Sequence, residues 1–445
     1  MNADPSAGDV LLWRPQTAMT RAEFRRAATR VAARLPPHRY AINLCESREQ
    51  FFVAFAACTL ASQTQLMPGA RTPLAVAELG AGYPDSHCIT DDDVARWRAP
   101  LSDEMCWGAA RTDPPAAALS LADDERLVLT AFTSGSTGKP QAHEKRGRAL
   151  VRSAALNSIA IRGALGVATD APVSIVGTVP PHHMYGIELT VLLPLLGGMS
   201  IDADRPLFPA DVAAALGRTA RSRVLVSTPL HLRALAEADV EFPEIGLIVS
   251  ATAPLDADLA LRIESRLRAP LLEMFGSTET CVIATRRTVR EQEWRLYDGI
   301  SIEAQPDSTR VTAAWFAHAQ QLQDVLELCG TDHFALRGRN SDLVEVAGKR
   351  ASLADITRRI CAVAGVEDAV AFQPETASGV ANRVAAVVVS RRVTARQIAS
   401  ELAAGLDAVF VPRPLVLVDR IPRDPLGKVS RARLLELARG QSTPD

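Results

Sequence analysis

The sequence has 445 residues, and 49 Lys and Arg against 51 Asp and Glu give a net charge of -2. Hydrophobic residues make up 47% and charged residues 22%, which is typical of a globular chain and excludes disorder throughout. The near-neutral charge argues against a dedicated nucleic-acid-binding protein, and no apolar run reaches the ~20 residues that a membrane span needs. At about 150 residues per domain, the length allows two or three domains.

The first predicted helix covers residues 20–35, where Thr20 can cap the N-terminus and Glu23 follows three residues later. A more buried helix is expected at residues 51–61. Further along, apolar β-branched runs alternate with helical patterns. They predict strands at residues 126–132, 173–179, 223–226 and 246–249, and helices at residues 209–216, 230–238 and 256–267. This alternation predicts a large α/β domain over residues 1–338.

The elements become shorter and more charged after the polar turn at residues 338–342. Strands are expected at residues 343–346, 383–389 and 414–417, and helices at residues 353–363 and 394–410. Residues 339–445 are therefore predicted to form a small α+β domain.

The seven cysteines include no pair at CxxC spacing, so neither a disulfide framework nor a zinc site is expected. Most of them are interpreted as small buried apolar residues. The first ten residues lack the basic and then apolar pattern of a signal peptide, which makes a cytoplasmic location the default expectation.

The strongest local motif directly follows the strand predicted at residues 126–132. It is Thr133-Ser134-Gly135-Ser136-Thr137-Gly138-Lys139. Glycines let main-chain N–H groups approach a phosphate, hydroxyls donate hydrogen bonds and lysine neutralises charge. The spacing is not that of a Walker A loop, because two residues separate the glycines and Pro140 follows the lysine. A flexible Gly/Ser turn is the simpler alternative.

Two further segments carry polar residues beside glycine. Thr278 and Glu279 follow an apolar run, and their hydroxyl and carboxylate could hold a phosphate oxygen and Mg²⁺ together, although such a pair is more often a helix cap. Lys428 follows Gly427 near the C-terminus, where it could swing toward a substrate or simply be solvated.

In this order the three segments resemble the adenylate-forming superfamily of acyl-CoA synthetases, peptide-synthetase adenylation domains and luciferases. The resemblance continues through residues 181–186, 250–255, 338–342 and 346–350. It implies a large ATP- and acid-binding domain (residues 1–338) and a small mobile domain that carries the adenylation lysine (residues 339–445). It also implies that a carboxylic acid attacks the α-phosphate of Mg-ATP, after which a thiol displaces AMP from the acyl-adenylate.

The resemblance implies a role for each matching residue. Thr278 would contact the α-phosphate, Glu279 would ligate Mg²⁺, and Lys428 would bridge the carboxylate and the α-phosphate. The other residues implied for ATP and AMP are the loop Thr133, Ser134, Gly135, Ser136, Thr137, Gly138 and Lys139, the adenine neighbours Thr252, Ala253, Met274, Phe275, Gly276 and Ser277, and the ribose neighbours Asp324 and Arg339.

The acyl pocket would contain His183 as its gate, with Tyr185, Gly186, Ser227, Ser250 and Ala251. For His183 the alternative is a buried histidine satisfied by main-chain carbonyls, and for Tyr185 it is a packing role.

The sequence departs from the superfamily pattern at several positions. Leu322-Gln323 precede Asp324 where Thr-Gly is usual, and Ser341 occupies the hinge position. Gln141-Ala142-His143 stand where Lys-Gly-Val is commoner.

Residues 180–188 and 342–350 look like the short ligases of aryl polyene and xanthomonadin pigment pathways. That likeness implies an aryl acid of the hydroxybenzoate type and the phosphopantetheine thiol of an acyl carrier protein as acceptor. An acyl-CoA synthetase that uses CoA is the near alternative. A non-catalytic acyl or nucleotide sensor on the same fold is the second, and retention of Lys139, Glu279 and Lys428 argues against it.

Overall fold

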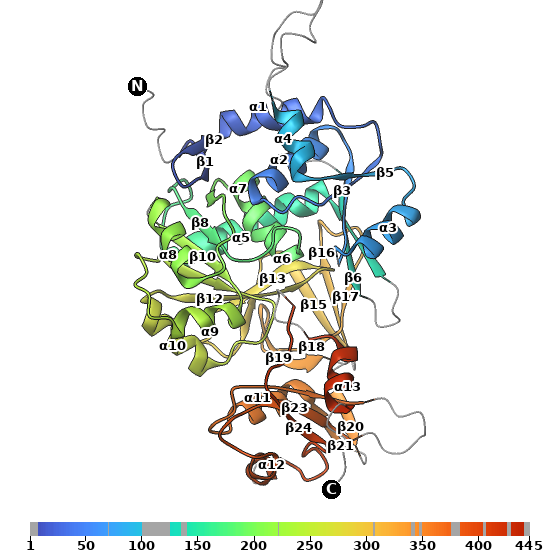
Figure 1. The fold of residues 1–445 in the computed structure, drawn as a ribbon, viewed down its shortest axis with the longest axis vertical. Coiled ribbons are helices and arrows are strands. Elements are labelled where there is room, and N and C mark those ends of the chain that lie inside the picture. Colours follow the sequence, from blue (N-terminus) through green and yellow to red (C-terminus); the bar gives the residue numbers. More distant parts are fainter. Residues whose placement is uncertain are drawn as a thin grey trace, which may run out of the picture. The chain divides into compact units, whose positions relative to one another are not determined.

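The chain divides into two compact units (Figure 1). Unit 1 comprises residues 1–300 and 313–318, and unit 2 comprises residues 301–312 and 319–445. The computed structural model describes residues 8–69, 71–99, 125–134, 140–220, 222–305, 308–339, 343–346, 349–374, 383–403, 406–424 and 429–439. The boundary predicted at residue 338 falls inside unit 2, and the functional division of the chain stays a prediction.

Unit 1 contains a five-stranded sheet of order β5-β3-β4-β6-β7. All neighbouring strands are parallel except β6 and β7, which form an antiparallel pair. The strands are β3 (Tyr40–Asn43), β4 (Thr64–Met67), β5 (Ser86–Ile89), β6 (Leu127–Ser134) and β7 (Pro140–Arg146). The accompanying helices are α1 (Arg21–Ala32), α2 (Arg48–Leu60), α3 (Pro73–Gly82) and α4 (Asp91–Arg98).

The strands of unit 1 in the larger sheet follow the order β14-β13-β12-β11-β10-β8-β9-β1-β2. The strands from β12 to β1 in this order are parallel, and antiparallel strands flank them. The bounds are β1 (Val10–Trp13), β2 (Ala18–Thr20), β8 (Ser174–Gly177), β9 (Ser200–Asp202), β10 (Arg223–Ser227), β11 (Leu247–Ser250), β12 (Leu271–Ser277), β13 (Cys281–Arg286) and β14 (Trp294–Leu296).

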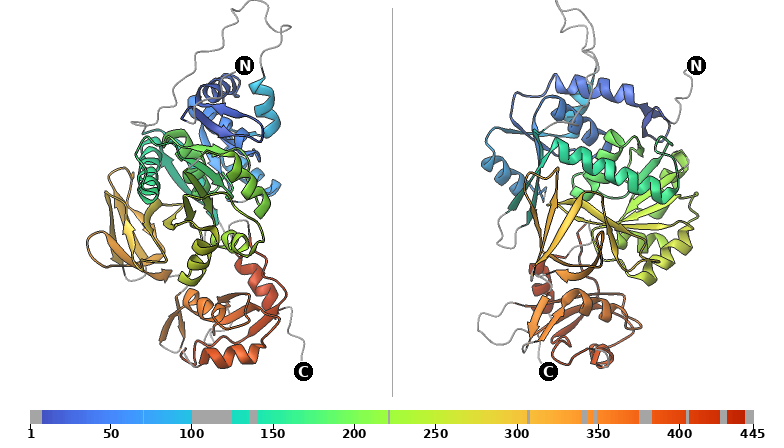
Figure 2. Two further views of the ribbon diagram at one scale, coloured as in Figure 1. Left: turned by 90° about the vertical axis from the view of Figure 1, so that its left-hand side faces the viewer. Right: turned by 180° about the vertical axis from the view of Figure 1, so that it is seen from behind.

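Helices cover both faces of the parallel strands (Figure 2). On one face α8 (Pro209–Arg218), α9 (Pro229–Glu237) and α10 (Ala257–Leu267) enclose a buried apolar core that includes Leu225 and Ile248. On the other face lies the long helix α5 (Gly147–Leu165). Near it the chain forms α6 (Met184–Ile187), the π-helical turn η2 (Glu188–Leu192) and α7 (Leu193–Leu196). The α/β prediction for this part of the chain is confirmed.

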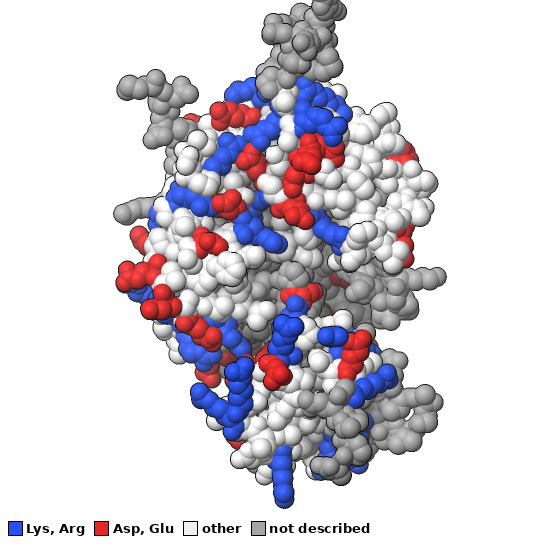
Figure 3. All heavy atoms as spheres, in the orientation of Figure 1, with Lys and Arg blue, Asp and Glu red and all other residues white. Residues whose placement is uncertain are grey.

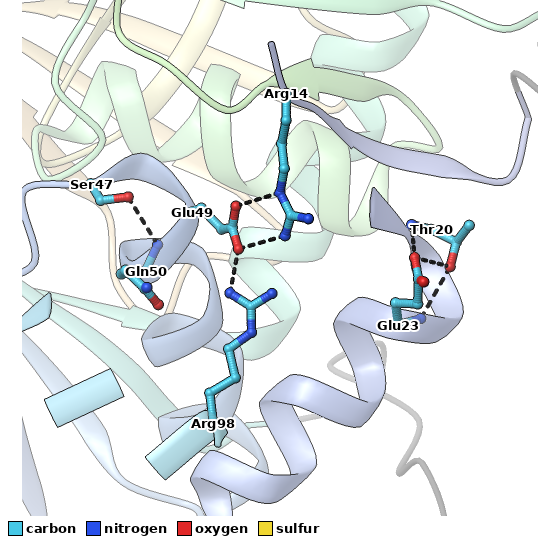
Figure 4. A network of polar contacts seen from close by, with 7 residues as sticks. All are labelled: Arg14, Thr20, Glu23, Ser47, Glu49, Gln50 and Arg98. Carbon is cyan, nitrogen blue, oxygen red and sulfur yellow. Dashed lines mark hydrogen bonds and ion pairs between the residues drawn. The ribbon is translucent and has the colours of Figure 1, made fainter. Parts of the chain in front are cut away.

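Local signals account for several helix starts. The predicted capping box is present: the Thr20 side chain accepts from the Glu23 main chain, while the Glu23 carboxylate accepts from the main-chain N–H of Thr20 at 2.8 Å (Figure 4). Ser47 caps α2 through its side chain, which accepts from the Gln50 main chain, so this helix begins at Arg48, earlier than the predicted residue 51.

Unit 2 is built from small antiparallel and mixed sheets with three helices among its described residues. The strands are β15 (Ile300–Gln305), β16 (Ser308–Ala313), β17 (Gln320–Leu322), β18 (Asp324–Leu328), β19 (His333–Arg339), β20 (Leu343–Val346), β21 (Lys349–Ser352), β22 (Asp368–Phe372), β23 (Ala385–Val389) and β24 (Leu415–Val418). The helices are α11 (Leu353–Cys361), α12 (Ala395–Ala403) and α13 (Arg431–Arg439). The predicted α+β composition is therefore confirmed, although α12 ends at Ala403, well before the predicted residue 410.

Two further expectations can be compared with the described residues. Among them, no helix has both the length and the apolar character that a bilayer crossing requires. None of the described cysteines forms a disulfide; Cys45, Cys58 and Cys281 are buried and Cys88, Cys329 and Cys361 are exposed, while Cys106 lies outside the described residues, so the interpretation of most cysteines as buried stays a prediction.

Candidate active site

The carboxyl ends of the parallel strands bring several predicted site residues to one edge of the large sheet. Ser227 ends β10, Ser250 ends β11 and Ser277 ends β12. Ligands of open α/β sheets bind at this edge, because strand ends and their loops supply polar groups there. The predicted acyl-pocket and adenine residues of these strands thus lie along a common edge.

The acyl-pocket serines are fully buried at this edge. The Ser227 hydroxyl lies 2.8 Å from the hydroxyl of Thr178, which follows β8. The Ser250 hydroxyl has no hydrogen-bond partner within the described part of the chain. A buried hydroxyl without a partner costs free energy, so a polar group of a bound substrate could stabilise it.

The structure favours the packing role for Tyr185. Its hydroxyl lies 3.2 Å from the main-chain oxygens of both Ser227 and Val249, to which it can donate. Burial, with a smaller contribution from Glu188, raises the pKa of Tyr185 well above its usual value. The phenol therefore ties α6 to the ends of β10 and β11.

Gly186 allows a close turn before α6. A Cβ atom at this position would lie 1.9 Å from the main-chain oxygen of Pro180, which no side chain permits. His183, the predicted gate, is the N-cap residue of α6 and is half-buried, with its ring centroid 4.4 Å from that of His182. Burial, together with Arg71, His183 and Arg205, lowers the pKa of His182 to about 2, which keeps that imidazole neutral.

The adenine candidates follow β11 and line β12. Ala251 is buried, and Thr252 has a φ of 82°, a left-handed conformation that turns the chain sharply toward Ala253. On β12, Met274 is buried, while Phe275 is half-buried and its ring lies against Trp294 with centroids 5.4 Å apart.

The segment with Thr278 and Glu279 is a turn between β12 and β13, which excludes the helix-cap alternative. Hydrogen bonds from the Ser277 main chain to the Thr280 hydroxyl (3.2 Å), and from the Thr280 main chain to the Ser277 hydroxyl (3.3 Å), close the turn. Gly276 is needed at its base, because a Cβ atom there would lie 2.2 Å from the main-chain oxygen of Cys281. The half-exposed side chains of Thr278 and Glu279 therefore stand at the tip of a constrained turn.

Strand β6, which precedes the predicted phosphate loop, pairs with β7, and side chains of β7 contact the turn that carries Glu279. Thr133 and Ser134 end β6, and Ser134 pairs with Pro140 at the start of β7. The loop thus joins two antiparallel strands, β6 and β7, rather than a strand and a helix. The loop residues themselves, Gly135, Ser136, Thr137, Gly138 and Lys139, lie outside the described residues.

Two β7 residues that the sequence analysis gave no role connect β6 to the turn. His143 Nε2 lies 3.0 Å from the Thr133 hydroxyl and 3.7 Å from Glu279 Oε1. The Lys145 ammonium donates to the main-chain oxygen of Glu279. Burial lowers the pKa of His143, against the opposing influence of Glu279. The sequence departs from the superfamily pattern at residues 141–143, which include His143. That departure did not by itself reveal that His143 contacts Thr133 and Glu279.

The carboxylate of Glu279 suits a magnesium ion that is shared with phosphate oxygens. Among the described residues, no group of three or more His, Cys, Asp or Glu side chains gathers as a metal cage. Mg²⁺ is usually held by one or two carboxylates together with substrate phosphates, and Glu279 with 28% of its side chain exposed can act in this way.

The predicted ribose residues belong to unit 2. Asp324 begins β18, and its register partner is Arg339, the last residue of β19. Asp324 is buried, and its main-chain oxygen accepts a hydrogen bond from the Thr309 hydroxyl at 2.8 Å. The structure thus places the two predicted residues side by side. The hinge candidate Ser341 and the adenylation candidate Lys428 lie outside the described residues.

Comparisons with known proteins match residues 3–305 to the family described as AMP-binding enzyme. A 4-coumarate–CoA ligase from Rhodobacter capsulatus is 30% identical over 53% of this chain and 58% of its own length, so that the match spans little more than half of the relative. The enzyme of the same name from Halorhodospira halophila is 28% identical over 68% of this chain and 74% of its own length.

A solved structure extends the likeness to nearly the whole chain. The o-succinylbenzoate CoA synthetase of Bacillus subtilis, in complex with its acyl-adenylate intermediate, superposes with a TM-score of 0.78 at 16% identity, over 98% of this chain and 96% of that one. At this identity the likeness establishes the fold, a large α/β domain with a smaller C-terminal domain. Because the family match covers more than half of the sequence, the chain belongs to the AMP-binding enzyme family.

Proposed function

We propose that the protein is an ATP-dependent ligase that converts a carboxylic acid into an acyl-adenylate and passes the acyl group to a thiol. Family membership carries this proposal. The position of His143 between the Thr133 hydroxyl and the Glu279 carboxylate supports it, because a hydroxyl and a carboxylate are groups that can bind phosphate oxygens and Mg²⁺. A cytoplasmic location remains a prediction.

In the proposed first step, a carboxylate oxygen attacks the α-phosphorus and pyrophosphate leaves. Thr278 and Glu279 would serve this step from the tip of their turn, Thr278 toward the α-phosphate and Glu279 toward Mg²⁺. The bound ion would supply charge neutralisation. Reactions of this kind depend on positioning and electrostatic stabilisation more than on proton transfer, which suits a site whose described residues are held by neighbouring strands.

For the acid we propose an aromatic substrate of the hydroxybenzoate or hydroxycinnamate type. The names of the two curated relatives contain 4-coumarate, a hydroxylated aromatic acid. The buried Ser250 hydroxyl supports a polar contact in the pocket. The likeness of residues 180–188 and 342–350 to pigment-pathway ligases points to the same class.

For the acceptor we propose a phosphopantetheine thiol, on an acyl carrier protein or, as the alternative, on CoA. The names of the relatives contain CoA. An acidic carrier protein would need free basic side chains. In unit 2, Arg358 and Arg359 both pair with Asp355, and Arg433 pairs with Glu436. Both positive and negative side chains are exposed on the face that Figure 3 shows. These pairs weaken the argument for the carrier protein.

The test is acid-dependent release of pyrophosphate from Mg-ATP, with hydroxylamine to trap the acyl-adenylate. The acid panel contains hydroxybenzoates, hydroxycinnamates and short and medium fatty acids. We expect an aryl hydroxamate; a fatty-acid product would keep the reaction and discard the aromatic substrate. Holo-carrier protein and CoA are then compared as acceptors. If no acid of the panel gives pyrophosphate or hydroxamate while the protein still binds ATP, the sensor alternative is supported instead.

Replacing Lys428 by Ala tests the proposed adenylation lysine. Loss of a positive charge that stabilises the transition state typically slows a reaction by on the order of 10²–10³-fold. We expect adenylate formation to fall by that factor while ATP binding changes little. The matched control is Arg391→Ala, which removes an exposed positive charge from unit 2. If Lys428→Ala forms the acyl-adenylate at the wild-type rate, Lys428 has no role in the adenylation step.

A further inference from the structure

Strand β7 buries polar side chains where a sheet usually buries apolar ones. Side chains alternate between the faces of a strand, so His143 and Lys145 share one face. They are 7% and 5% exposed, whereas Ala142 and Glu144 on the opposite face are exposed. Lysine is almost never fully buried without a partner, so this arrangement requires an explanation.

Lys145 holds the main chain of the Glu279 turn from one side. Its ammonium donates to the main-chain oxygen of Glu279. From the other side the fully buried carboxylate of Glu188 accepts from the main-chain N–H of Val282 at 3.0 Å. Burial raises the pKa of Glu188, while the hydrogen bonds to its carboxyl group and the charge of Lys145 act in the opposite direction. The Lys145 ammonium and the Glu188 carboxyl group thus fix both ends of the segment 279–282.

The Glu188 carboxylate is itself anchored to α5. The Ser153 hydroxyl donates to it at 2.5 Å, and the Asn157 amide lies 3.4 Å away. The Tyr297 hydroxyl in turn donates to the Asn157 side-chain oxygen at 2.9 Å. The charge pair that brackets the turn therefore belongs to a network with satisfied polar groups, which makes the turn rigid.

His143 acts on side chains rather than on the main chain. A single ring nitrogen, Nε2, faces both the Thr133 hydroxyl at 3.0 Å and Glu279 Oε1 at 3.7 Å. Thr133 ends the strand that leads into the predicted phosphate loop, and Glu279 is the proposed magnesium ligand. The imidazole thus limits the rotamers of both groups at once.

We propose that His143 and Lys145 are positioning residues, which hold the Thr133 hydroxyl and the Glu279 carboxylate ready for Mg-ATP. The proposal rests on the proposed function of the site. Side chains that are ordered before binding lose less conformational entropy on binding, and groups behind a metal ligand commonly change metal affinity by about 10–100-fold. An apolar residue at either position could not supply these contacts.

The first experiment measures ATP affinity by calorimetry, once with Mg²⁺ and once with EDTA, for the wild type, His143→Leu and His143→Gln. We expect His143→Leu to weaken Mg-ATP binding by about 10–100-fold and to weaken ATP binding in EDTA clearly less, because the Thr133 hydroxyl serves ATP in both conditions whereas Glu279 acts only through Mg²⁺. His143→Gln should recover most of the loss, because its amide can face both partners. Glu144→Leu, on the exposed face of β7, is the matched control.

Two results would overturn the proposal: wild-type affinity of His143→Leu for Mg-ATP, or equal weakening with Mg²⁺ and with EDTA. The wild type separates this failure from failure of the proposed function. If the wild-type protein binds no ATP in either condition, the proposed function is wrong and the positioning role falls with it. If the wild type binds Mg-ATP more tightly than ATP in EDTA, only the roles of the β7 residues are in question.

Lys145 is tested together with its countercharge. Lys145→Met alone leaves the Glu188 carboxylate buried without its cation and can prevent folding. The double variant Lys145→Met/Glu188→Gln removes both charges and should recover thermal stability. We expect this folded double variant still to bind Mg-ATP more weakly than the wild type, with a smaller loss of ATP affinity in EDTA. If the double variant has both the stability and the Mg-ATP affinity of the wild type, Lys145 has only a structural role and its positioning role is wrong.

Discussion

Glu49 joins distant parts of unit 1 through two arginines (Figure 4). Arg14, which follows β1, donates twice to its carboxylate at 2.7 Å, and Arg98 at the end of α4 donates to the same group. Burial raises the pKa of Glu49, but the hydrogen bonds and charges of both arginines outweigh it, so that the pKa lies below its usual value. The ionised carboxylate therefore stabilises the fold.

This residue gives a prediction for acid stability. A carboxyl group with a lowered pKa in the folded state contributes stability above its unfolded pKa, about 4.5, and loses that contribution as pH falls through its folded pKa. Glu49→Gln should lower the free energy of unfolding at pH 7 by about 1–3 kcal/mol, and its stability should fall less below pH 4.5. Urea unfolding between pH 3 and pH 7 measures both effects. Glu46→Gln, an exposed neighbour, is the control; equal pH profiles of wild type and Glu49→Gln would contradict the assignment.

At the scale of elements, the turn between β12 and β13 requires glycine at position 276. The reason is the pairing of the two strands, which the local sequence does not show. The register of the two strands shifts at Gly276, and Cys281 at the other side has a φ of 64°. The two strands approach so closely that a side chain at position 276 would overlap the main chain of Cys281. This close approach of the two strands constrains the conformation of the turn tip that carries Thr278 and Glu279.

Gly276→Ala should therefore destabilise unit 1 by about 1–3 kcal/mol or more, and reduce Mg-ATP binding with it. The matched control is Gly80→Ala in α3, where an added Cβ meets nothing within 4 Å. Alanine there should raise stability by roughly 0.5–1 kcal/mol, because glycine disfavours a helix. Thermal unfolding compares the two variants, and a Gly276→Ala protein as stable as the wild type would mean that the turn is less constrained than its geometry indicates.

The same turn shows what the sequence can and cannot predict. The helix at Thr20 was predictable because its capping box is a signal within four residues. The apolar run before Thr278 was visible in the sequence, but the extent of β12 to Ser277 depends on pairing with β13, which no local pattern reveals. His143 and Lys145 gave no signal as a pair, because a polar residue on a strand is expected in solvent unless a partner from another element buries it.

At the scale of the whole molecule, the change in composition and the division into compact units fall at different residues. The sequence becomes more charged after residue 338, whereas unit 2 also includes residues 301–312 and 319–338. These earlier segments contain β16 and β17, which pair with each other. Charge and hydropathy indicate whether a residue is buried, not which element it pairs with, so composition alone does not report a unit boundary that strand pairing sets.

The central claim is that a carboxylate oxygen attacks the α-phosphorus of ATP. The most direct measurement uses an acid labelled with ¹⁸O in its carboxylate, with Mg-ATP and a thiol acceptor, and mass spectrometry of the products. When the thiol attacks the acyl carbon, the acyl C–O bond breaks and AMP leaves with the bridging oxygen. We predict AMP that carries one ¹⁸O atom and unlabelled pyrophosphate. ADP with labelled inorganic phosphate would show attack at the γ-phosphorus and contradict the account.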